Sequence, residues 1–467
     1  MLIEQISKFK NKMFEPIDIA ILVYFRIIFG AIMLWEVLKY FSSGWISRYW
    51  IDPPFNFTYY GFDWVKPLPG DGMFYLFGIM GVLSIFIIIG FKYRIVTTLF
   101  FIGFTYTFLL EQTRFLNHFY LISLISFLMI FVPAHKALSI DSWLNKKSYS
   151  DFAPYWSLWI LKFQIAIVYF FGGIQKINYD WLHGEPMRHW LSEKTDFPIL
   201  GAYFTEEWMV YLLSYSALGL DLLAIPFLMW KKSRWIAFGF LVAFHVMNSQ
   251  LFTIGVFPWF MILAVLIFFD PSWPRLGKWK KSQNKTYFPK TSSGLTKNQK
   301  IVFAMLMIFV IFQTTMPLRH YFYPDYEGWT DEAHLFSWTM KLRDKHTDEL
   351  TIRAIDHTTG KIGVVNPMFD LTREQLSKLS HSPDLMVQYS HYLIEELKSQ
   401  GYSDNVEIRI ESWVSLNGRE PQLLIDPNID LTKQEPTIFH KDWIMPFNNT
   451  QLGTHYEGIV FNLNPEY

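Results

Sequence analysis

The sequence predicts a polytopic α-helical membrane bundle of about eight to nine spans in residues 1–317, followed by an extracytoplasmic mixed α+β domain in residues 318–467. Three observations predict this fold class. Hydrophobic residues make up 51% of the 467-residue chain and the mean hydropathy is +0.16, which is too apolar for a soluble chain of this length. Long apolar runs recur up to residue 317. Beyond that point, apolar and polar residues alternate as they do in strands.

The apolar runs are candidate membrane spans because each is long enough, or nearly so, to cross about 30 Å of hydrocarbon. They cover residues 18–40, 73–91, 95–111, 117–134, 156–176, 208–230, 235–248, 250–269 and 300–317. The seventh and eighth runs are short, so we expect them to be broken or partly re-entrant. The first run is not preceded by the features of a cleaved signal peptide, so we expect it to remain as the first span.

Lys and Arg residues gather in connections that share one side of the bundle if the spans alternate in direction. These connections are the N-terminal segment and residues 91–94, 135–155, 231–234 and 278–300. Such an excess of positive charge predicts the cytoplasmic side. We therefore expect a cytoplasmic N-terminus and an extracytoplasmic C-terminal domain.

The basic loop from Lys278 to Lys300 is rich in Ser, Thr and Asn, and we interpret it as a flexible, solvated connector. The formal net charge of the chain is zero, so bulk charge gives no argument for a nucleic-acid partner. We expect the lipid bilayer as a partner, and no nucleic acid.

The C-terminal part has the pattern of a mixed α+β domain. Strand-like runs lie at residues 350–355 and 406–410, a Gly-containing turn lies at 358–361, and a helix-like stretch covers 371–399. This domain is expected to cap the outer face of the bundle.

Several kinds of site are excluded or disfavoured by residue type and spacing. The chain has no cysteine, which excludes disulfides, thiolate nucleophiles and Cys-ligated metals. The histidines near the spans show no HxxxH or HxH spacing, so we predict no metal site. The Gly-x-Ser-x-Gly motif of serine hydrolases is absent as well.

The candidate site is centred on Lys176, which ends an apolar run containing a tyrosine and a glycine pair. A charge there is costly unless it has a function, and an amine in apolar surroundings loses proton affinity and can act as a base. Asn117 and His118 open the fourth span at its outer end, and His245 with Asn248 ends the seventh on the same side.

Each of these residues alone has an ordinary explanation. A histidine near a helix end often makes a structural hydrogen bond, and a terminal lysine often extends to the headgroups. Because three separate spans bring ionisable groups to one height, we predict a site where the bundle meets the outer domain, open to lipid and aqueous substrates.

Longer motifs at these positions resemble those of the vitamin K-dependent gamma-glutamyl carboxylase family. The motifs are residues 114–121, 164–181, 244–258 and 271–275, with further likeness at 336–338, 412–417 and 425–427. The likeness covers nearly the whole chain, and the motifs in the fifth and seventh spans are long enough to be specific.

The resemblance implies an integral membrane enzyme that uses reduced vitamin K (the hydroquinone, or a menaquinol), with O2 and CO2 as co-substrates. In that family the lysine matching Lys176 deprotonates the quinol, and oxygenation to the epoxide generates a strong base. This base removes a γ-proton from a glutamate of a protein or peptide substrate, and the carbanion captures CO2. Residues matching Asn117, His118 and His245 would orient and stabilise the quinol or its oxygenated anions, with Asn248 as a further cofactor contact.

The resemblance also implies where the glutamate binds. The family's glutamate-binding segment matches residues 334–345, which here contain Ser337 and Trp338 and offer Arg343 and Lys345 as cations for a carboxylate. A solvated basic turn is the alternative interpretation of these cations. Tyr169 lies two helical turns before Lys176 and is expected to face the glutamate or to pack as an ordinary core tyrosine.

Two departures from the animal enzymes predict a bacterial-type homologue. The disulfide that links their membrane and outer parts has no counterpart here, so the two parts must dock non-covalently. The chain also ends sooner after Asp426 and Pro427. Together the two departures imply a protein of a bacterial inner (cytoplasmic) membrane, and they count against propeptide-guided substrate choice. Two other functions stay open at this point: a quinol-oxygenating membrane enzyme without glutamate carboxylation, and a non-catalytic quinone- or lipid-binding membrane protein.

Overall fold

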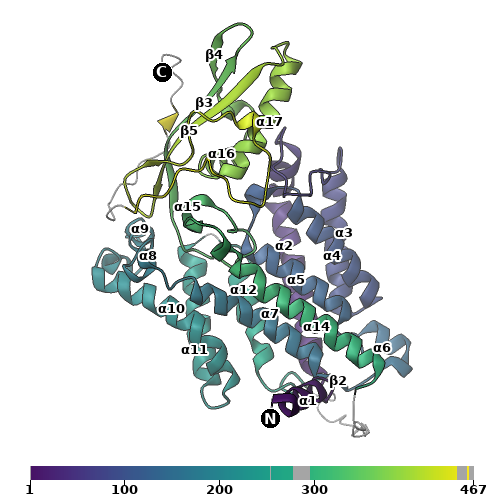
Figure 1. Ribbon diagram of the computed structural model, residues 1–467. Helices are drawn as coiled ribbons and strands as arrows, with labels where there is room; N and C mark the ends of the chain where they lie inside the picture. Colours follow the sequence, from purple (N-terminus) through teal and green to yellow (C-terminus); the bar gives the residue numbers. More distant parts are fainter. Residues whose placement is uncertain (1, 253, 277–294, 450–459, 462–467) are drawn as a thin grey trace.

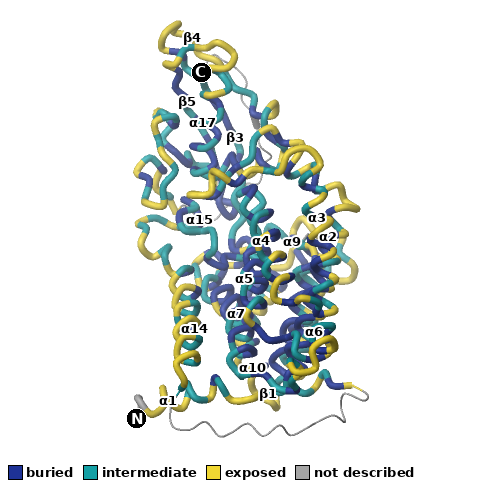
Figure 2. Tube along the Cα trace, turned by 90° about the vertical axis from the view of Figure 1, so that its right-hand side faces the viewer, coloured by how far each residue is buried: buried dark blue, intermediate teal, exposed yellow. Residues whose placement is uncertain are grey.

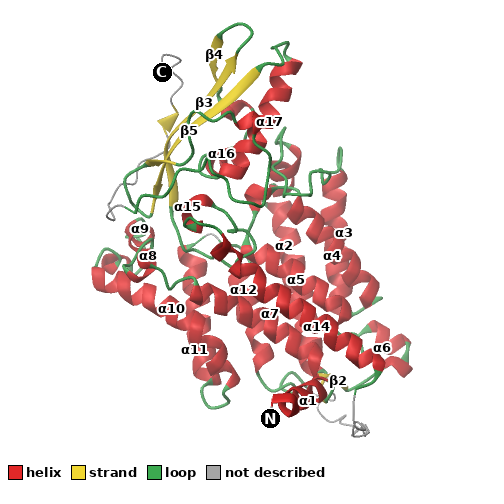
Figure 3. Cartoon of the chain, in the orientation of Figure 1, coloured by secondary structure: helices red, strands yellow, loops and turns green. Residues whose placement is uncertain are grey.

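The computed structural model describes residues 2–252, 254–276, 295–449 and 460–461. It is mostly helical, and its main sheet lies at one end of the molecule (Figures 1 and 3). A short pair of strands, β1 (Pro16–Asp18) and β2 (Phe152–Pro154), lies near the other end. Most of the predicted connector from Lys278 to Lys300 falls outside the described residues.

In the described ranges, a helix lies at each predicted span. These helices are α2 (Ala20–Ser42), α3 (Gly72–Ile89), α4 (Tyr93–Leu109), α5 (Asn117–Phe131), α7 (Tyr155–Ile174), α10 (Glu207–Met229), α11 (Arg234–Leu251), α12 (Phe257–Ala264) and α14 (Lys297–Thr315). Among the described residues, five helices are long and apolar enough to cross a membrane, namely α2, α3, α7, α10 and the helical stretch that begins with α14. The helices α4, α5 and α12 are apolar but shorter.

The bundle core is formed mainly by α2, α3, α4, α5, α7 and α12. The helices α2 and α3 approach closely where α2 carries Gly30, because a Cβ there would lie 2.9 Å from the Ser84 carbonyl oxygen. By contrast, α14 runs along the outside of the bundle and is largely exposed (Figure 2). Its exposed side chains include Ile301, Ile308 and Ile311, which is what a lipid-facing helix requires.

The C-terminal sheet contains β3 (Lys345–Asp356), β4 (Lys361–Val364), β5 (Val406–Leu416), β6 (Gln422–Leu423) and β7 (Val460–Phe461). Its order is β4-β3-β5-β6, with antiparallel pairing along this path, and β7 pairs with β3 in parallel. In the long central pair, Ile352 lies opposite Ile410, and both side chains are buried in a core separate from that of the bundle. The predicted turn at 358–361 lies at the β3–β4 hairpin.

The helix-like stretch at 371–399 divides into two helices, α16 (Arg373–Leu379) and α17 (Pro383–Ser399). Pro383 starts the second helix, a position that its fixed φ angle and missing N–H favour. The remaining helices are short or peripheral: α1 (Leu2–Met13), α6 (Ile140–Leu144), α8 (Tyr179–Leu182), α9 (Met187–Ser192) and α15 (Glu327–Thr330).

The helical bundle and the sheet region are joined by buried polar contacts. Asp180, which follows α7, accepts hydrogen bonds from both terminal nitrogens of Arg419 at 2.6 and 2.8 Å, and from Asn417 at 2.6 Å. On another side, Gln375 of α16 donates to Glu111 at 2.9 Å. These charge-assisted bonds hold the two regions together without a disulfide, which a chain without cysteine cannot form.

Candidate functional site

A cavity of about 510 Å³ lies where the helical bundle meets the C-terminal region. Its walls come from α5, α7, α10, α11 and α12, the segment 334–345, and α16. Eight of the predicted site residues line it, and these are Asn117, His118, Tyr169, Lys176, His245, Asn248, Arg343 and Lys345. The structure therefore brings together residues that are up to 228 positions apart in the sequence, from Asn117 to Lys345.

Lys176 lies in the turn just after α7, and its amine points toward α10. Its Nζ donates to Oδ2 of Asp221 at 2.8 Å and to the carbonyl oxygen of Gly172 at 2.9 Å. Lys176 is 5% exposed and Asp221 is 6% exposed, so this ion pair is almost fully withdrawn from solvent. The pair lines the cavity, and it fixes the position of the amine there.

The glycine pair before Lys176 makes this arrangement possible. A Cβ at Gly173 would lie 2.7 Å from Leu222 Cδ2, and one at Gly172 would lie 3.5 Å from Asp221 Oδ2. Without these side chains, α10 packs directly on α7 and brings its carboxylate to the amine. Asp221 is absent from the sequence predictions, although a carboxylate inside an apolar span is itself a signal for function.

Four further polar side chains face the same cavity. The Tyr169 hydroxyl lies 2.8 Å from Nε2 of His245. Asn117 donates through Nδ2 to the Thr339 carbonyl oxygen at 2.9 Å, which fixes its amide, while its Oδ1 is buried and has no partner among the described residues. The His118 ring stacks on Phe257 at 5.3 Å. The unpaired Oδ1 is an acceptor suited to a hydroxyl of a bound ligand.

The remaining wall beside these groups is apolar. It contains Phe115, Leu116, Val168, Phe244, Phe252, Phe257 and Met261. The cavity thus combines an aromatic and aliphatic wall with a few fixed hydrogen-bonding groups. Such a lining, in a cavity of this volume, suits a small aromatic ligand with an apolar substituent. A quinol fits this description, because its ring would pack on the wall and its hydroxyl would reach Asn117.

The other end of the cavity is basic. Arg343 pairs with Asp331 and donates to the Gly328 carbonyl oxygen at 2.6 Å, while Lys345 lies 3.5 Å from Asp331 and donates to the Trp329 carbonyl oxygen. Burial favours the neutral form of Asp331, but Arg343 and Lys345 outweigh it and hold the pKa of its carboxyl below its usual value. Burial lowers the pKa of Lys345 to about 7, against the opposing effect of Asp331.

Ser337 and Trp338 lie behind the cavity wall and not on it. Both are 0% exposed, the Ser337 carbonyl oxygen accepts from Gln175 at 2.7 Å, and the Trp338 ring stacks on Tyr120 at 4.8 Å. The segment around them has left-handed backbone at Asp331, Ala333, Phe336, Trp338 and Lys341, with φ between 51° and 65°. Such conformations persist only where the surroundings hold them, and they are common at functional sites. These two residues therefore shape the wall that carries Thr339 and Arg343.

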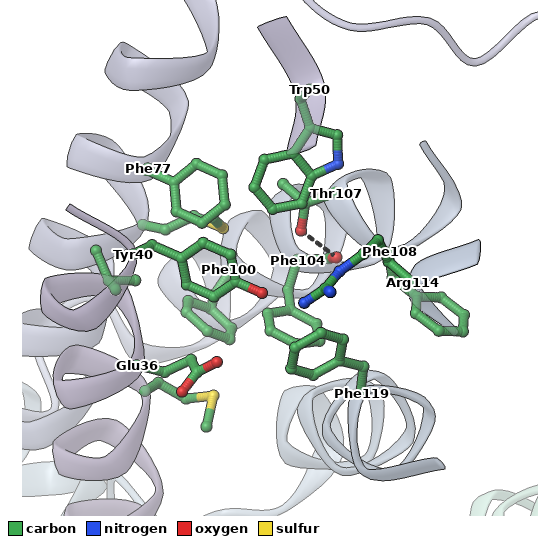
Figure 4. A pocket seen from close by; sticks show the side chains of 13 residues that line it. Glu36, Tyr40, Trp50, Phe77, Phe100, Phe104, Thr107, Phe108, Arg114 and Phe119 are labelled. Carbon is green, nitrogen blue, oxygen red and sulfur yellow. Dashed lines mark hydrogen bonds between the residues drawn. The ribbon is translucent and has the colours of Figure 1, made fainter. Parts of the chain in front are cut away.

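A second, smaller pocket lies among α2, α3, α4 and the start of α5. Figure 4 shows the Glu36 carboxylate and the Arg114 guanidinium pointing into it among aromatic rings. Its volume is about 30 Å³, and the buried Glu36 Oε2 and Trp50 Nε1 have no partner among the described residues. This space suits a water molecule and is too small for a quinol ring. The large cavity is therefore the candidate site.

Among the described residues, no three His, Asp or Glu side chains gather in a way that would hold a metal ion.

Comparisons with known proteins match both parts of the chain. Residues 14–273, more than half of the chain, match the HTTM domain. Residues 298–450 match the vitamin K-dependent gamma-carboxylase lumenal domain. No solved structure matches the chain. The two domain matches occur in order along one mostly helical, membrane-type chain, and this chain therefore belongs to the vitamin K-dependent gamma-carboxylase family.

Proposed function

We propose that this protein couples the oxygenation of reduced vitamin K, or of a menaquinol, to the γ-carboxylation of glutamate in a protein substrate, with CO2 as the carbon source. The observation that carries the proposal is the buried amine of Lys176, held at the edge of the cavity by Asp221. In its neutral form, the amine placed there can take a proton from a quinol hydroxyl, and Asp221 stabilises the ammonium ion that results.

The chain's other residues would hold the reactants. Asn117 accepts a hydrogen bond from the quinol through its free Oδ1, and His118 and the Tyr169–His245 pair complete the polar edge beside Lys176. When bound, reduced vitamin K supplies the strong base for the glutamate γ-proton through its oxygenation to the epoxide. The apolar wall of the cavity would limit the water that reaches that chemistry.

The glutamate would enter from the basic end. Arg343 and Lys345 lie there as cations for its carboxylate, and Asn248, which lines the same cavity, would be a further contact for the quinol. We further propose that residues 1–317 form the membrane domain and residues 318–467 an extracytoplasmic domain, in a bacterial inner membrane. The lumenal match of the C-terminal part and the exposed apolar face of α14 support this arrangement.

A direct assay tests the proposed function. Purified protein incubated with vitamin K hydroquinone, O2, a short glutamyl peptide and labelled bicarbonate is expected to yield vitamin K epoxide and labelled γ-carboxyglutamate. Omission of the quinol is expected to abolish both products, because carboxylation depends on the base that oxygenation supplies. Epoxide without labelled peptide would instead assign quinol oxygenation alone.

Replacement of both Arg343 and Lys345 by Ala is expected to raise the KM for glutamyl peptide about tenfold or more, because each charge-assisted hydrogen bond to a carboxylate is worth about 1.5–3 kcal/mol. The effect on epoxidation measured without peptide is expected to be much smaller. Kinetics of both reactions provide the measurement. Exposed Lys361 and Lys433 of the same domain, replaced together by Ala, are the matched control. Equal losses in both reactions would assign Arg343 and Lys345 to folding or docking instead.

A further inference from the structure

Five cationic side chains line the cavity, and four of them have partners. Lys176 pairs with Asp221, Arg343 and Lys345 share Asp331, and Lys341 lies over the rings of Trp190 and Phe252 at 5.2 and 4.7 Å. The fifth is Lys378 of α16, which has no carboxylate, carbonyl or aromatic partner for its amine among the described residues.

The charged surroundings of Lys378 are mostly cationic. The side chain is exposed toward the cavity that it lines. Burial of this region lowers the pKa of Lys378, and the positive charge of Arg343 lowers it further, while only Asp331 opposes the shift. Lys378 therefore lies near another cation and has no carboxylate of its own among the described residues. An anion that binds beside it stabilises its positive charge.

The charges at this end of the cavity can be compared with those of the reaction. When Lys345 is protonated, Arg343 and Lys345 together carry two positive charges, and Asp331 cancels one of them. That leaves one positive charge, which matches the single carboxylate of a glutamate side chain. Lys378 adds a second.

Proton removal changes the charge of the glutamate. When the γ C–H bond breaks, the proton leaves to the base and the electron pair stays on the γ-carbon, shared with the adjacent carboxylate. The group then carries two negative charges in place of one. The pair next forms the C–C bond to CO2, and the product carries two carboxylates on one carbon.

We propose that Lys378 binds the glutamate carboxylate and supplies the second positive charge that this group requires once its γ-proton is removed. Arg343 and Lys345 match the resting glutamate, whereas Lys378 matches the dianion and the product. A charge placed where negative charge develops lowers the barrier more than it strengthens substrate binding. This inference rests on the proposed function and adds a residue outside the segment 334–345.

The test compares kcat and KM for carboxylation of a short glutamyl peptide. Lys378→Met, which removes the charge and keeps the length, is expected to lower kcat about 10- to 100-fold, the cost of one hydrogen bond to a charged group. Lys378→Arg is expected to retain most of the kcat, because the guanidinium keeps the charge. Lys433→Met, at an exposed lysine of the same domain, is the matched control.

Epoxidation without peptide reports whether the quinol part of the cavity is intact, and Lys378→Met is expected to lower it far less than it lowers carboxylation. Three results for Lys378→Met would overturn the role of Lys378 and leave the proposed function in place. These are a wild-type kcat, a rise in KM alone, and equal losses of epoxidation and carboxylation. A wild-type protein that carboxylates no glutamyl peptide would overturn both.

Discussion

Lys176→Ala is expected to lower vitamin K epoxidation and glutamate carboxylation together, by about 10²- to 10⁴-fold, the usual contribution of a general base. Both reactions depend on the same first proton transfer, so neither is spared. The measurement is the initial rate of epoxide formation and of label incorporation in matched preparations. A small primary amine added to Lys176→Ala is expected to restore part of both rates, because Asp221 Oδ2 and the Gly172 carbonyl oxygen remain as acceptors for it.

Lys176→Arg separates the base from a purely structural cation. The guanidinium keeps the positive charge near Asp221 but does not release its proton near neutral pH, so we expect this variant to be inactive. If Lys176 only anchored the helix end, Arg would be tolerated and Ala would mainly lower the yield of folded protein. An active Lys176→Arg protein would therefore contradict the assignment of Lys176 as the base.

Much of the fold could be predicted from the sequence because apolar length and strand alternation are local properties. The long apolar runs predict the positions of the bundle helices. The strands β3 and β5 correspond to two segments in which apolar and polar residues alternate, with a helical stretch between them. Span number is harder to predict, since α4, α5 and α12 are apolar but short, and length alone does not decide whether they cross the bilayer. The helix-like pattern of residues 371–399 does not predict the break at Ser380–Ser382, although Pro383 favours a helix start.

The gathering of Asn117, His118, Lys176 and His245 was predictable because alternating spans fix the height of residues at helix ends. Side-chain partners were not predictable in the same way. Asp221 lies in the middle of a span, 45 positions from Lys176, and only the packing of α10 on the glycine pair shows that the two meet. Lys378 lies on a helix that looks like an ordinary amphipathic surface element, and only the docking of that helix places it in the cavity.

The segment 334–345 shows why residue type alone can mislead. Trp338 lies in the segment that matches the family's glutamate-binding segment, which implied a substrate contact, and the structure places its side chain fully buried against Tyr120 in the bundle core. The contact with the cavity is made by its neighbours Thr339 and Met340. A series of left-handed residues turns the backbone there, and nothing in the sequence marks which side chains then face the cavity.

Asp221→Asn is expected to lower both epoxidation and carboxylation about 10²- to 10³-fold, the range found when one preorganised electrostatic contact to a developing charge is removed. The amide keeps the shape and a hydrogen bond to Lys176, but it no longer stabilises the ammonium ion that forms when the amine takes the quinol proton. The measurement is the rate of each reaction across a range of pH. Glu207→Gln, at an exposed carboxylate of the same helix, is the matched control and is expected to behave as wild type.

A conservative variant distinguishes this role from simple packing. Asp221→Glu keeps the carboxylate charge, so it is expected to retain more of both rates than Asp221→Asn. Wild-type rates in Asp221→Asn would show that Lys176 acts without Asp221. Equal losses in Asp221→Glu and Asp221→Asn would show that the 2.8 Å ion pair serves only to hold α7 against α10.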